Sequence, residues 1–311
     1  MKKEVDIKVK LYFNEESKMK IRAFIYIILA GIGWGTSGLF VNTLSKYGLS
    51  AIQIITARSV VSAIVISVYV LIHDRKLFRV SKKELLFYFL AGVGILLTGT
   101  FYFISMQMTS VSTAVVLMYT EPIFVMVFSV LFFGEKLNPL KTVSIICMLI
   151  GCCLVSGIVG GIEFNALGIA IGLGSGVAYT VYNIVTKIEM RKGYNPLSAT
   201  TYCFIFMSLL ALFISNPPQM VAIAAKNPFP VISLMLGIGT IACAIPYFLY
   251  TLSLRDLPVG TASSLSIVEP MAATVFSVVI LGEELVISSL IGIILIIGSV
   301  FLLGRSELRQ K

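Results

Sequence analysis

Two glutamates, each followed directly by a proline, are the residues of this chain best placed to do chemistry. Glu121-Pro122 and Glu269-Pro270 both lie within long apolar segments. A charged side chain at the centre of a bilayer costs at least about 2.5–3.5 kcal/mol on insertion scales, so a buried carboxylate points to a functional site. Each acid could take up a proton or hold an amine of a bound molecule. The alternative is architectural: a hydrogen-bonded glutamate could repair the backbone where the proline interrupts its helix.

The composition shows which solvent surrounds these acids. Hydrophobic residues make up 58% of the 311 residues and charged residues only 13%, well outside the range of soluble domains. A net charge of +9 would suit a nucleic-acid-binding protein if the basic residues lined one surface. Here they fall in short segments between apolar runs, which indicates a polytopic protein of the lipid bilayer that binds no nucleic acid.

Apolar stretches of about 18 residues or more, enough to cross a hydrocarbon core of ~30 Å, divide the chain into ten expected membrane spans. These spans are 20–43, 50–72, 84–104, 110–133, 139–158, 165–187, 196–215, 229–251, 259–281 and 286–304. Most Lys and Arg residues then fall on the side of the two termini, whereas Lys46 and Lys226 lie in loops of the other side. Because basic residues gather on cytoplasmic loops, we expect a multi-pass protein of the plasma (inner) membrane with both termini in the cytoplasm.

The second half of the chain repeats the first. Segments 113–135 and 261–283, compared at an offset of 148 without a gap, are identical at 11 of 23 positions, including both Glu-Pro pairs and a Gly-Glu pair. Nearer the start of each half the offset is 141, and it pairs Asn42 with Asn183 and Lys46 with Lys187. Each half holds five spans, and an odd number of spans forces the two halves to be antiparallel.

With Gly33-Trp34-Gly35-Thr36 in the first span, Arg58 in the second, and the paired Glu-Pro and Gly-Glu motifs, the chain resembles the EamA type of the drug/metabolite transporter superfamily. The resemblance implies an all-α integral membrane fold of ten transmembrane helices in two inverted five-helix repeats. It also implies a central cavity lined mainly by helices 1, 3, 4, 6, 8 and 9, and export of small metabolites. The expected divisions are 1–19, a cytoplasmic segment, 20–158 and 159–304, the two repeats, and 305–311, a cytoplasmic tail.

The two prolines predict the local structure around the acids. Both glutamates fall near the middle of their spans, the depth at which inverted-repeat transporters place their sites. Pro122 and Pro270 each remove a backbone donor, so each helix is expected to kink beside its acid. The carbonyls left without that donor are those of Met118 and Ser266.

Several polar and aromatic residues in the middle of spans could line a cavity together with the acids. Amphipathic rings at this depth do not fit an interfacial belt, and they could stack on a substrate ring or hold an ammonium group. The alternative for each is ordinary helix packing. The candidates for substrate binding or coupling are Glu121, Glu269, Trp34, Tyr102, Tyr119, Tyr179, Tyr182, Asn183, Tyr250 and Arg58, with Pro122 and Pro270 as kink residues.

Arg58 is a basic residue well inside the second span, and its charge could offset a glutamate or attract an anionic group. The alternative is that its long side chain reaches to the outer interface. The glycines of the first and sixth spans partly follow the spacing that lets helices approach closely, and packing is the simpler interpretation of them. The five cysteines all lie in apolar runs without the spacing of a zinc site, so no metal or cofactor is expected.

The sequence therefore predicts a secondary transporter that exports small metabolites, either amino acids or related amines, by alternating access, with protons as a candidate coupling ion. The first alternative is an importer or exchanger of the same fold, with Arg58 binding an acidic substrate. A membrane enzyme is disfavoured because the chain has one histidine and its acids lie at mid-depth. A channel is disfavoured because no filter-like segment is present. Either a monomer or a homodimer fits the sequence.

Overall fold

The computed structural model describes residues 2–135, 138–157, 165–282 and 284–309, with side chains from residue 18 to residue 307. All regular elements in these ranges are helices. The first half contains α1 (Lys2–Gly35), α2 (Ser37–Lys46), α3 (Ala51–His73), η1 (Arg75–Phe78), α4 (Lys82–Met108), α5 (Val111–Met118), α6 (Glu121–Phe133) and α7 (Pro139–Val155). The second half contains α8 (Ala166–Arg191), α9 (Pro196–Ile214), α10 (Pro217–Lys226), α11 (Pro228–Gly239), η3 (Thr240–Ala244), α12 (Ile245–Ser253), α13 (Val259–Leu265), α14 (Val268–Phe276), η4 (Ser277–Leu281) and α15 (Ile287–Arg309).

Local sequence signals set the ends of several helices. Ser50 and Ser81 each begin a helix with a capping box, in which the serine and a side chain three residues later satisfy each other's backbone donors. Gly134 and Gly282 end the helical segments that contain the two acids, with φ of 65° and 72°. Glycine adopts this left-handed conformation without the steric cost that a Cβ imposes. Both Gly-Glu motifs therefore include a helix stop, although Glu283 lies outside the described residues.

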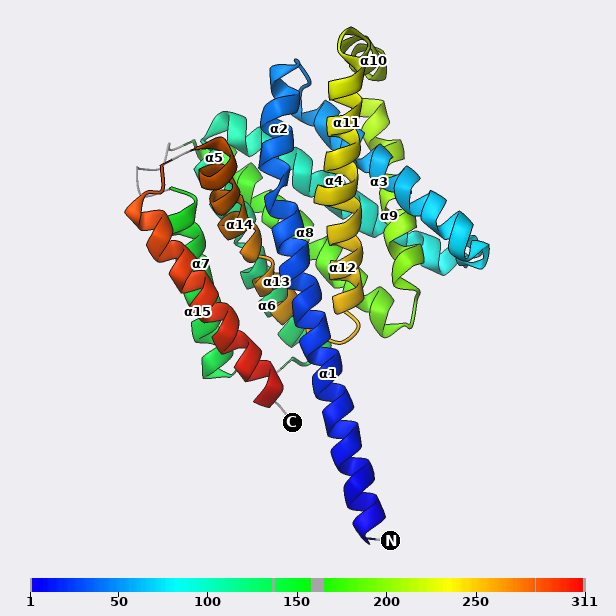
Figure 1. Cartoon of the computed structure of the whole chain (residues 1–311), viewed down its shortest axis with the longest axis vertical. Coiled ribbons are helices and arrows are strands. Elements are labelled where there is room, and N and C mark those ends of the chain that lie inside the picture. The colour runs from blue at the N-terminus through cyan, green and yellow to red at the C-terminus, as the bar shows by residue number, and fades with distance from the viewer. Residues whose placement is uncertain (1, 136–137, 158–164, 283, 310–311) are drawn as a thin grey trace.

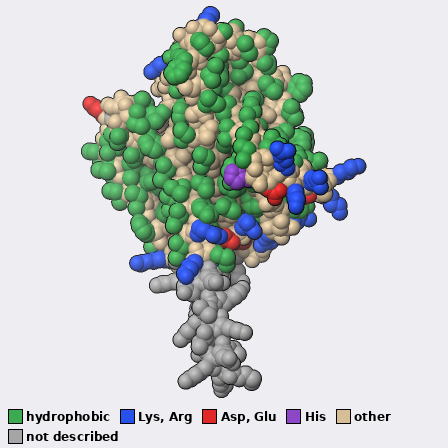
Figure 2. Space-filling model, turned by 45° about the vertical axis from the view of Figure 1, so that its right-hand side comes forward, with side chains coloured by type: hydrophobic (Ala, Val, Ile, Leu, Met, Phe, Trp, Pro, Cys, Tyr) green, Lys and Arg blue, Asp and Glu red, His purple; other side chains and the backbone are tan. Residues whose placement is uncertain are grey.

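Within the described ranges, nine helical segments are long and apolar enough to cross a membrane, and the shorter α7 is the tenth apolar one. These ten match the ten expected spans in order. Several helices extend beyond the expected spans. Helix α1 is helical back to Lys2, and α4, α8 and α15 continue to Met108, Arg191 and Arg309 rather than ending at 104, 187 and 304. Figure 2 shows hydrophobic side chains over most of the visible face, with most of its Lys and Arg toward one end.

Helices of each half pack mainly against helices of the other half, and the contacts follow the symmetry of the repeats (Figure 1). Helix α1 packs on α12 and α14 of the second half, and its counterpart α8 packs on α4, α5 and α6 of the first. Two further pairs join the repeats directly, because each helix packs on its own equivalent. These pairs are α3 with α9 and α7 with α15. Both termini lie at one end of the molecule, which we call the termini side, and α2 and α10 lie at the opposite end, the far side (Figure 1).

The pair of α7 and α15 is held by two facing glycines. A Cβ on Gly292 would lie 2.7 Å from the carbonyl oxygen of Gly151, and one on Gly151 would lie 2.9 Å from the carbonyl oxygen of Gly292. Both distances are shorter than a Cβ tolerates, and the obstacle is backbone that no rotamer change can move. This is the close approach expected where association depends on van der Waals packing rather than on the hydrophobic effect.

We expect Gly292→Ala to destabilise the protein by about 1–3 kcal/mol, because the added methyl group overpacks this contact. Gly298→Ala is the matched control, since it lies on the same helix and an added Cβ there meets nothing within 4 Å. The control should be neutral or slightly stabilising because alanine favours the helix. Thermal unfolding of the purified variants in detergent measures the difference, and equal melting temperatures would contradict this account of the α7 and α15 contact.

Candidate functional site

Each Glu-Pro pair lies where its membrane span is broken into two helices. Helix α5 ends at Met118 and α6 begins at Glu121, while α13 ends at Leu265 and α14 begins at Val268. Proline is tolerated in the first turn of a helix because the N–H that it lacks has no intrahelical acceptor there. A carboxylate at the same position faces the positive end of the helix dipole. At each expected kink the span has a short turn of right-handed backbone between two helical segments, with an acid at the start of the second segment.

Hydroxyl groups and short backbone bonds satisfy the broken backbone. In the first break Thr120 Oγ1 donates to the carbonyl of Leu117 at 2.6 Å. In the second, Ser266 Oγ donates to the carbonyl of Ser263, also at 2.6 Å. The expectation that Pro270 leaves the Ser266 carbonyl without a donor is wrong, because the backbone N–H of Glu269 donates to it at 2.9 Å. Backbone groups at membrane depth need partners of this kind.

Glu121 is completely buried and joins three helices. Its Oε1 accepts a hydrogen bond from Asn183 Nδ2 at 2.5 Å. Ser263 Oγ lies 2.7 Å from Oε1 and 2.8 Å from Oε2, within donating distance of both. Asn183 belongs to α8 and Ser263 to α13, and both are buried. The carboxyl group of α6 therefore ties the first repeat to two helices of the second.

Glu269 has different surroundings, although it occupies the equivalent position of the second repeat. It is partly exposed, and Tyr119 donates its hydroxyl hydrogen to Oε2 at 2.8 Å. Arg58 of α3 interacts with it electrostatically. The residue equivalent to Asn183 is Asn42, which is exposed on α2. One acid is thus enclosed by the protein, whereas the other keeps surface that a ligand could reach.

Arg58, for which sequence reasoning left a role beside an acid and a position at the outer interface open, is partly exposed. Its Nε atom is buried and has no hydrogen-bond partner among the described residues. Of the groups around it, the carboxyl group of Glu269 is the acid with which it interacts electrostatically. A buried donor without an acceptor is unfavourable, so a bound anionic group would relieve a cost already present in the fold.

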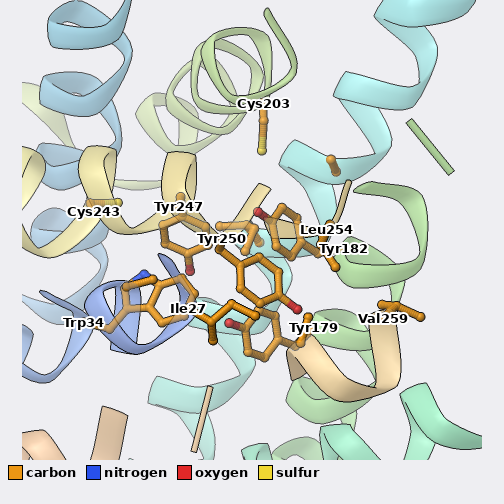
Figure 3. Packing of buried hydrophobic residues seen from close by; sticks show 14 of the residues in the cluster. Ile27, Trp34, Tyr179, Tyr182, Cys203, Cys243, Tyr247, Tyr250, Leu254 and Val259 are labelled. Carbon is orange, nitrogen blue, oxygen red and sulfur yellow. The ribbon is translucent and has the colours of Figure 1, made fainter. Parts of the chain in front are cut away.

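Most of the candidate aromatic residues form one packed cluster rather than the wall of an open chamber (Figure 3). The ring of Trp34 lies 5.0 Å from that of Tyr247 and 5.5 Å from that of Tyr250, between ring centroids. Tyr182 stacks on Tyr179 at 6.0 Å and on Tyr250 at 6.3 Å. These five rings and that of Tyr119 are buried. Tyr102, in contrast, is partly exposed and packs on Phe103.

The cluster contains polar atoms that the described residues leave unpaired. Trp34 Nε1 and the Tyr250 hydroxyl are both buried without a hydrogen-bond partner in this part of the chain. With Arg58 Nε they give three such atoms in and around the rings of Trp34, Tyr247 and Tyr250. Buried polar groups are normally satisfied, and exceptions of this kind concentrate where a ligand or water binds. Sequence reasoning missed Tyr247, whose equivalent in the first repeat is Gly99, so the repeat gave no signal for it.

Two charged residues of α8 were not among the predicted site residues, although Lys187 was identified as the repeat equivalent of Lys46. Lys187 is buried, and its Nζ donates to the carbonyls of Leu254 at 2.6 Å and Leu257 at 2.5 Å. Glu189 is buried, with Oε1 unpaired among the described residues, and it lines a cavity of about 10 Å³ beside Thr186. This volume is about the least that holds one water molecule. Helix α8 continues beyond the expected end of the span, and Glu189 lies in this extension.

A buried ionic cluster joins the repeats at the termini side. Glu135, after the glycine that ends α6, accepts the backbone N–H of Val259 at 2.9 Å. Its other oxygen lies 3.5 Å from Lys141 Nζ, which lies 3.4 Å from a carboxyl oxygen of Glu307. Glu307 also accepts a hydrogen bond from Thr261. The first Gly-Glu motif therefore connects α6, α7, α13 and α15.

Within the described ranges, no group of three or more His, Cys, Asp or Glu side chains is arranged to hold a metal ion. The site described above contains carboxylates, one guanidinium group, aromatic rings and hydroxyls. Such groups can bind and release a small polar molecule or a proton.

Comparison with known proteins agrees with this arrangement. The model of the EamA-like transporter family matches residues 21–157 and again residues 166–305. An uncharacterized transporter of Clostridium kluyveri is 27% identical over 295 residues, which cover 90% of this chain and 92% of that protein. The threonine/homoserine exporter RhtA of Escherichia coli is 27% identical over 212 residues, covering 67% of each chain.

A solved crystal structure has the same fold, with a TM-score of 0.74 at 18% identity, and the match covers 92% of this chain and 98% of that chain. The family match spans both halves of the chain, and each matched half contains one of the Glu-Pro breaks described above. The chain therefore belongs to the EamA-like transporter family.

Proposed function

We propose that the protein is a secondary transporter that exports small metabolites, amino acids or related amines, across the plasma membrane by alternating access. It converts no substrate chemically. Residues 20–158 and 159–304 are its two repeats, and 1–19 and 305–311 its cytoplasmic ends. The observation that carries the proposal is the difference between Glu121 and Glu269, equivalent acids of which one is enclosed and one partly exposed. Inverted repeats that adopt two different conformations open a central site to one side of the membrane at a time.

Helix register supports two different conformations of the repeats. A Cβ on Gly35 of α1 would lie 2.7 Å from Cβ of Ala272. Gly176, its equivalent in α8, faces Thr120 Oγ1 at 3.0 Å. The residue equivalent to Thr120 is Val268, four residues before Ala272, so the two glycine contacts differ by about one helical turn. One-turn shifts of packed helices are among the movements that switch proteins between states.

The interactions on the termini side support a state closed toward that side. There Glu121 is bonded to Asn183, and Lys187 holds the carbonyls between α12 and α13. Helix α8 runs unbroken through this region, whereas its counterpart is broken at Thr36 into α1 and α2. With the termini in the cytoplasm, as the basic residues favour, this is an outward-facing conformation.

The charges at the site favour a substrate that has both an amine and a carboxylate. Glu269 can bind an ammonium group, and Arg58 can bind a carboxylate through its fork of donors. The unpaired Nε1 of Trp34 is a further donor, and the rings beside it can contact a cation or an apolar side chain. The name of the exporter RhtA, a relative of modest identity, agrees with substrates of this type.

We expect Arg58→Gln to weaken the apparent affinity for amino acids while sparing transport of the corresponding amines that lack the carboxylate. A hydrogen bond to a charged group contributes about 1.5–3 kcal/mol, or roughly 10- to 100-fold in apparent affinity. Counterflow in proteoliposomes measures both substrates. Equal losses for the two substrates would contradict the assignment of Arg58 to the carboxylate.

Glu269→Gln should lower amine transport and flatten its dependence on pH, because glutamine neither carries the proton nor offers a negative charge. Tyr119→Phe, which removes the hydroxyl bonded to Glu269, should alter the pH profile while leaving the carboxylate in place. Glu284→Gln is the control, since Glu284 is exposed after η4. Transport rates measured from pH 5 to 9 test this, and an unaltered pH profile with normal rates in Glu269→Gln would exclude a coupling role.

The direction of transport has its own test in membrane vesicles. An exporter coupled to proton entry should accumulate substrate in inside-out vesicles when the lumen is acidic, because protons leaving the lumen then drive substrate inward. Accumulation in right-side-out vesicles with acid outside would instead identify an importer, the alternative with the same fold. Vesicles without the protein are the control for both gradients.

A further inference from the structure

On the termini side of the molecule, two residues of α8 hold the protein closed. Asn183 donates to Glu121, and Lys187, one turn later on the same face, donates to the carbonyls of Leu254 and Leu257. Those carbonyls lie where α12 ends and the chain turns into α13, a position at which a cation stabilises the negative end of a helix. We call Asn183 and Lys187 the inner latch.

The first repeat contains the same two side chains at the same spacing. Asn42 and Lys46 are the repeat equivalents of Asn183 and Lys187, and both are exposed on α2. In this state α2 packs elsewhere, with the ring of Phe40 only 2.5 Å from where a Cβ on Gly237 of α11 would lie. A single turn residue, Thr36, separates it from α1. The pattern of the inner latch is therefore present on the far side but not engaged.

The groups that this second pair would bind are also present. The equivalent of Glu121 is Glu269, which is partly exposed and accepts from Tyr119 alone among the hydrogen bonds of the described side chains. The equivalents of Leu254 and Leu257 are Met106 and Thr109, at the end of α4 just before the turn into α5. The last four carbonyls of a helix lack intrahelical donors, so these oxygens suit a lysine as the carbonyls after α12 do.

We propose that Asn42 and Lys46 form an outer latch, which engages Glu269 and the carbonyls of Met106 and Thr109 when the inner latch opens. In that state α2 continues α1 as one helix, as the unbroken α8 does now. The two residues are positioning residues that determine which side of the site is closed. This inference rests on the proposed alternating access, but it is independent of the identity of the substrate.

A cysteine at position 45 can report the state of α2 without any substrate. Ser45 is exposed, whereas its repeat equivalent Thr186 is buried in the engaged latch helix. Ser45→Cys should therefore react readily with a membrane-impermeant maleimide added from the far side. The chain without this substitution gives the background from the five native cysteines.

Breaking the inner latch should protect this cysteine. With Asn183→Ala and Lys187→Met added, we expect labelling of Ser45→Cys to slow by about fivefold or more, because charge-assisted hydrogen bonds that favour the present state are lost. Adding Lys46→Met should restore fast labelling, because the outer latch can no longer hold. Lys226→Met, which removes the other basic residue expected on that side of the membrane, should not restore it.

The outcomes separate this inference from the proposed function. Protection that persists with Lys46→Met would show that the far side closes without the outer latch, and would overturn the latch while leaving alternating access intact. No protection in a properly folded inner-latch variant, checked by its elution as a single species in detergent, would overturn both. Should that variant not fold, Lys46→Met alone decides: a several-fold loss of transport, absent in Lys226→Met, supports the latch, and normal transport overturns it.

Discussion

The enclosed carboxyl group of Glu121 is the interaction on which the observed state depends. It is one of few ionisable groups at mid-depth, and it bonds at once to a helix that crosses the membrane and to the half-helix α13. In lipid, removing one partner would leave a buried polar group unsatisfied, which costs more than the bond itself contributes. The bond therefore keeps α6, α8 and α13 in one arrangement until all three can rearrange together.

The broken spans are stable for a related reason. A helix break at membrane depth exposes backbone donors and acceptors to hydrocarbon, and each needs a partner. Thr120 and Ser266 provide such partners from within their own segments, so neither break depends on the opposing repeat for its backbone. The glutamate side chains are consequently available to bond across the repeats or to bind a ligand. The Glu-Pro motif therefore has two parts. The proline and the nearby hydroxyls shape the backbone of the turn, and the turn positions the glutamate side chain.

The sequence predicted the fold well because its signals are local and repeated. Hydrophobic length identified the spans, the prolines indicated the kinks, and the odd number of spans in each repeat indicated the inversion. Sequence reasoning could not predict features that depend on which conformation the protein adopts. Identical motifs predict identical surroundings for Glu121 and Glu269, and only coordinates show that one is enclosed. Likewise the sequence left two interpretations of the mid-span tyrosines open, a cavity lining and ordinary helix packing, and in the structure most of them pack against each other. Glu189 was missed because the ends of spans are poorly defined by hydropathy, and α8 continues beyond the expected end at 187.

The π-helical turn η3, between α11 and α12, gives the molecule an asymmetry that rearrangement of the repeats does not remove. Its counterpart, at positions 92–96 of α4, is regular α-helix. A wide turn takes one additional residue, which rotates everything beyond it by about 100° about the helix axis. Tyr247 and Tyr250 therefore face the site from an angle that α4 does not reproduce. In the proposed alternating access, the two states are consequently not related by an exact two-fold axis.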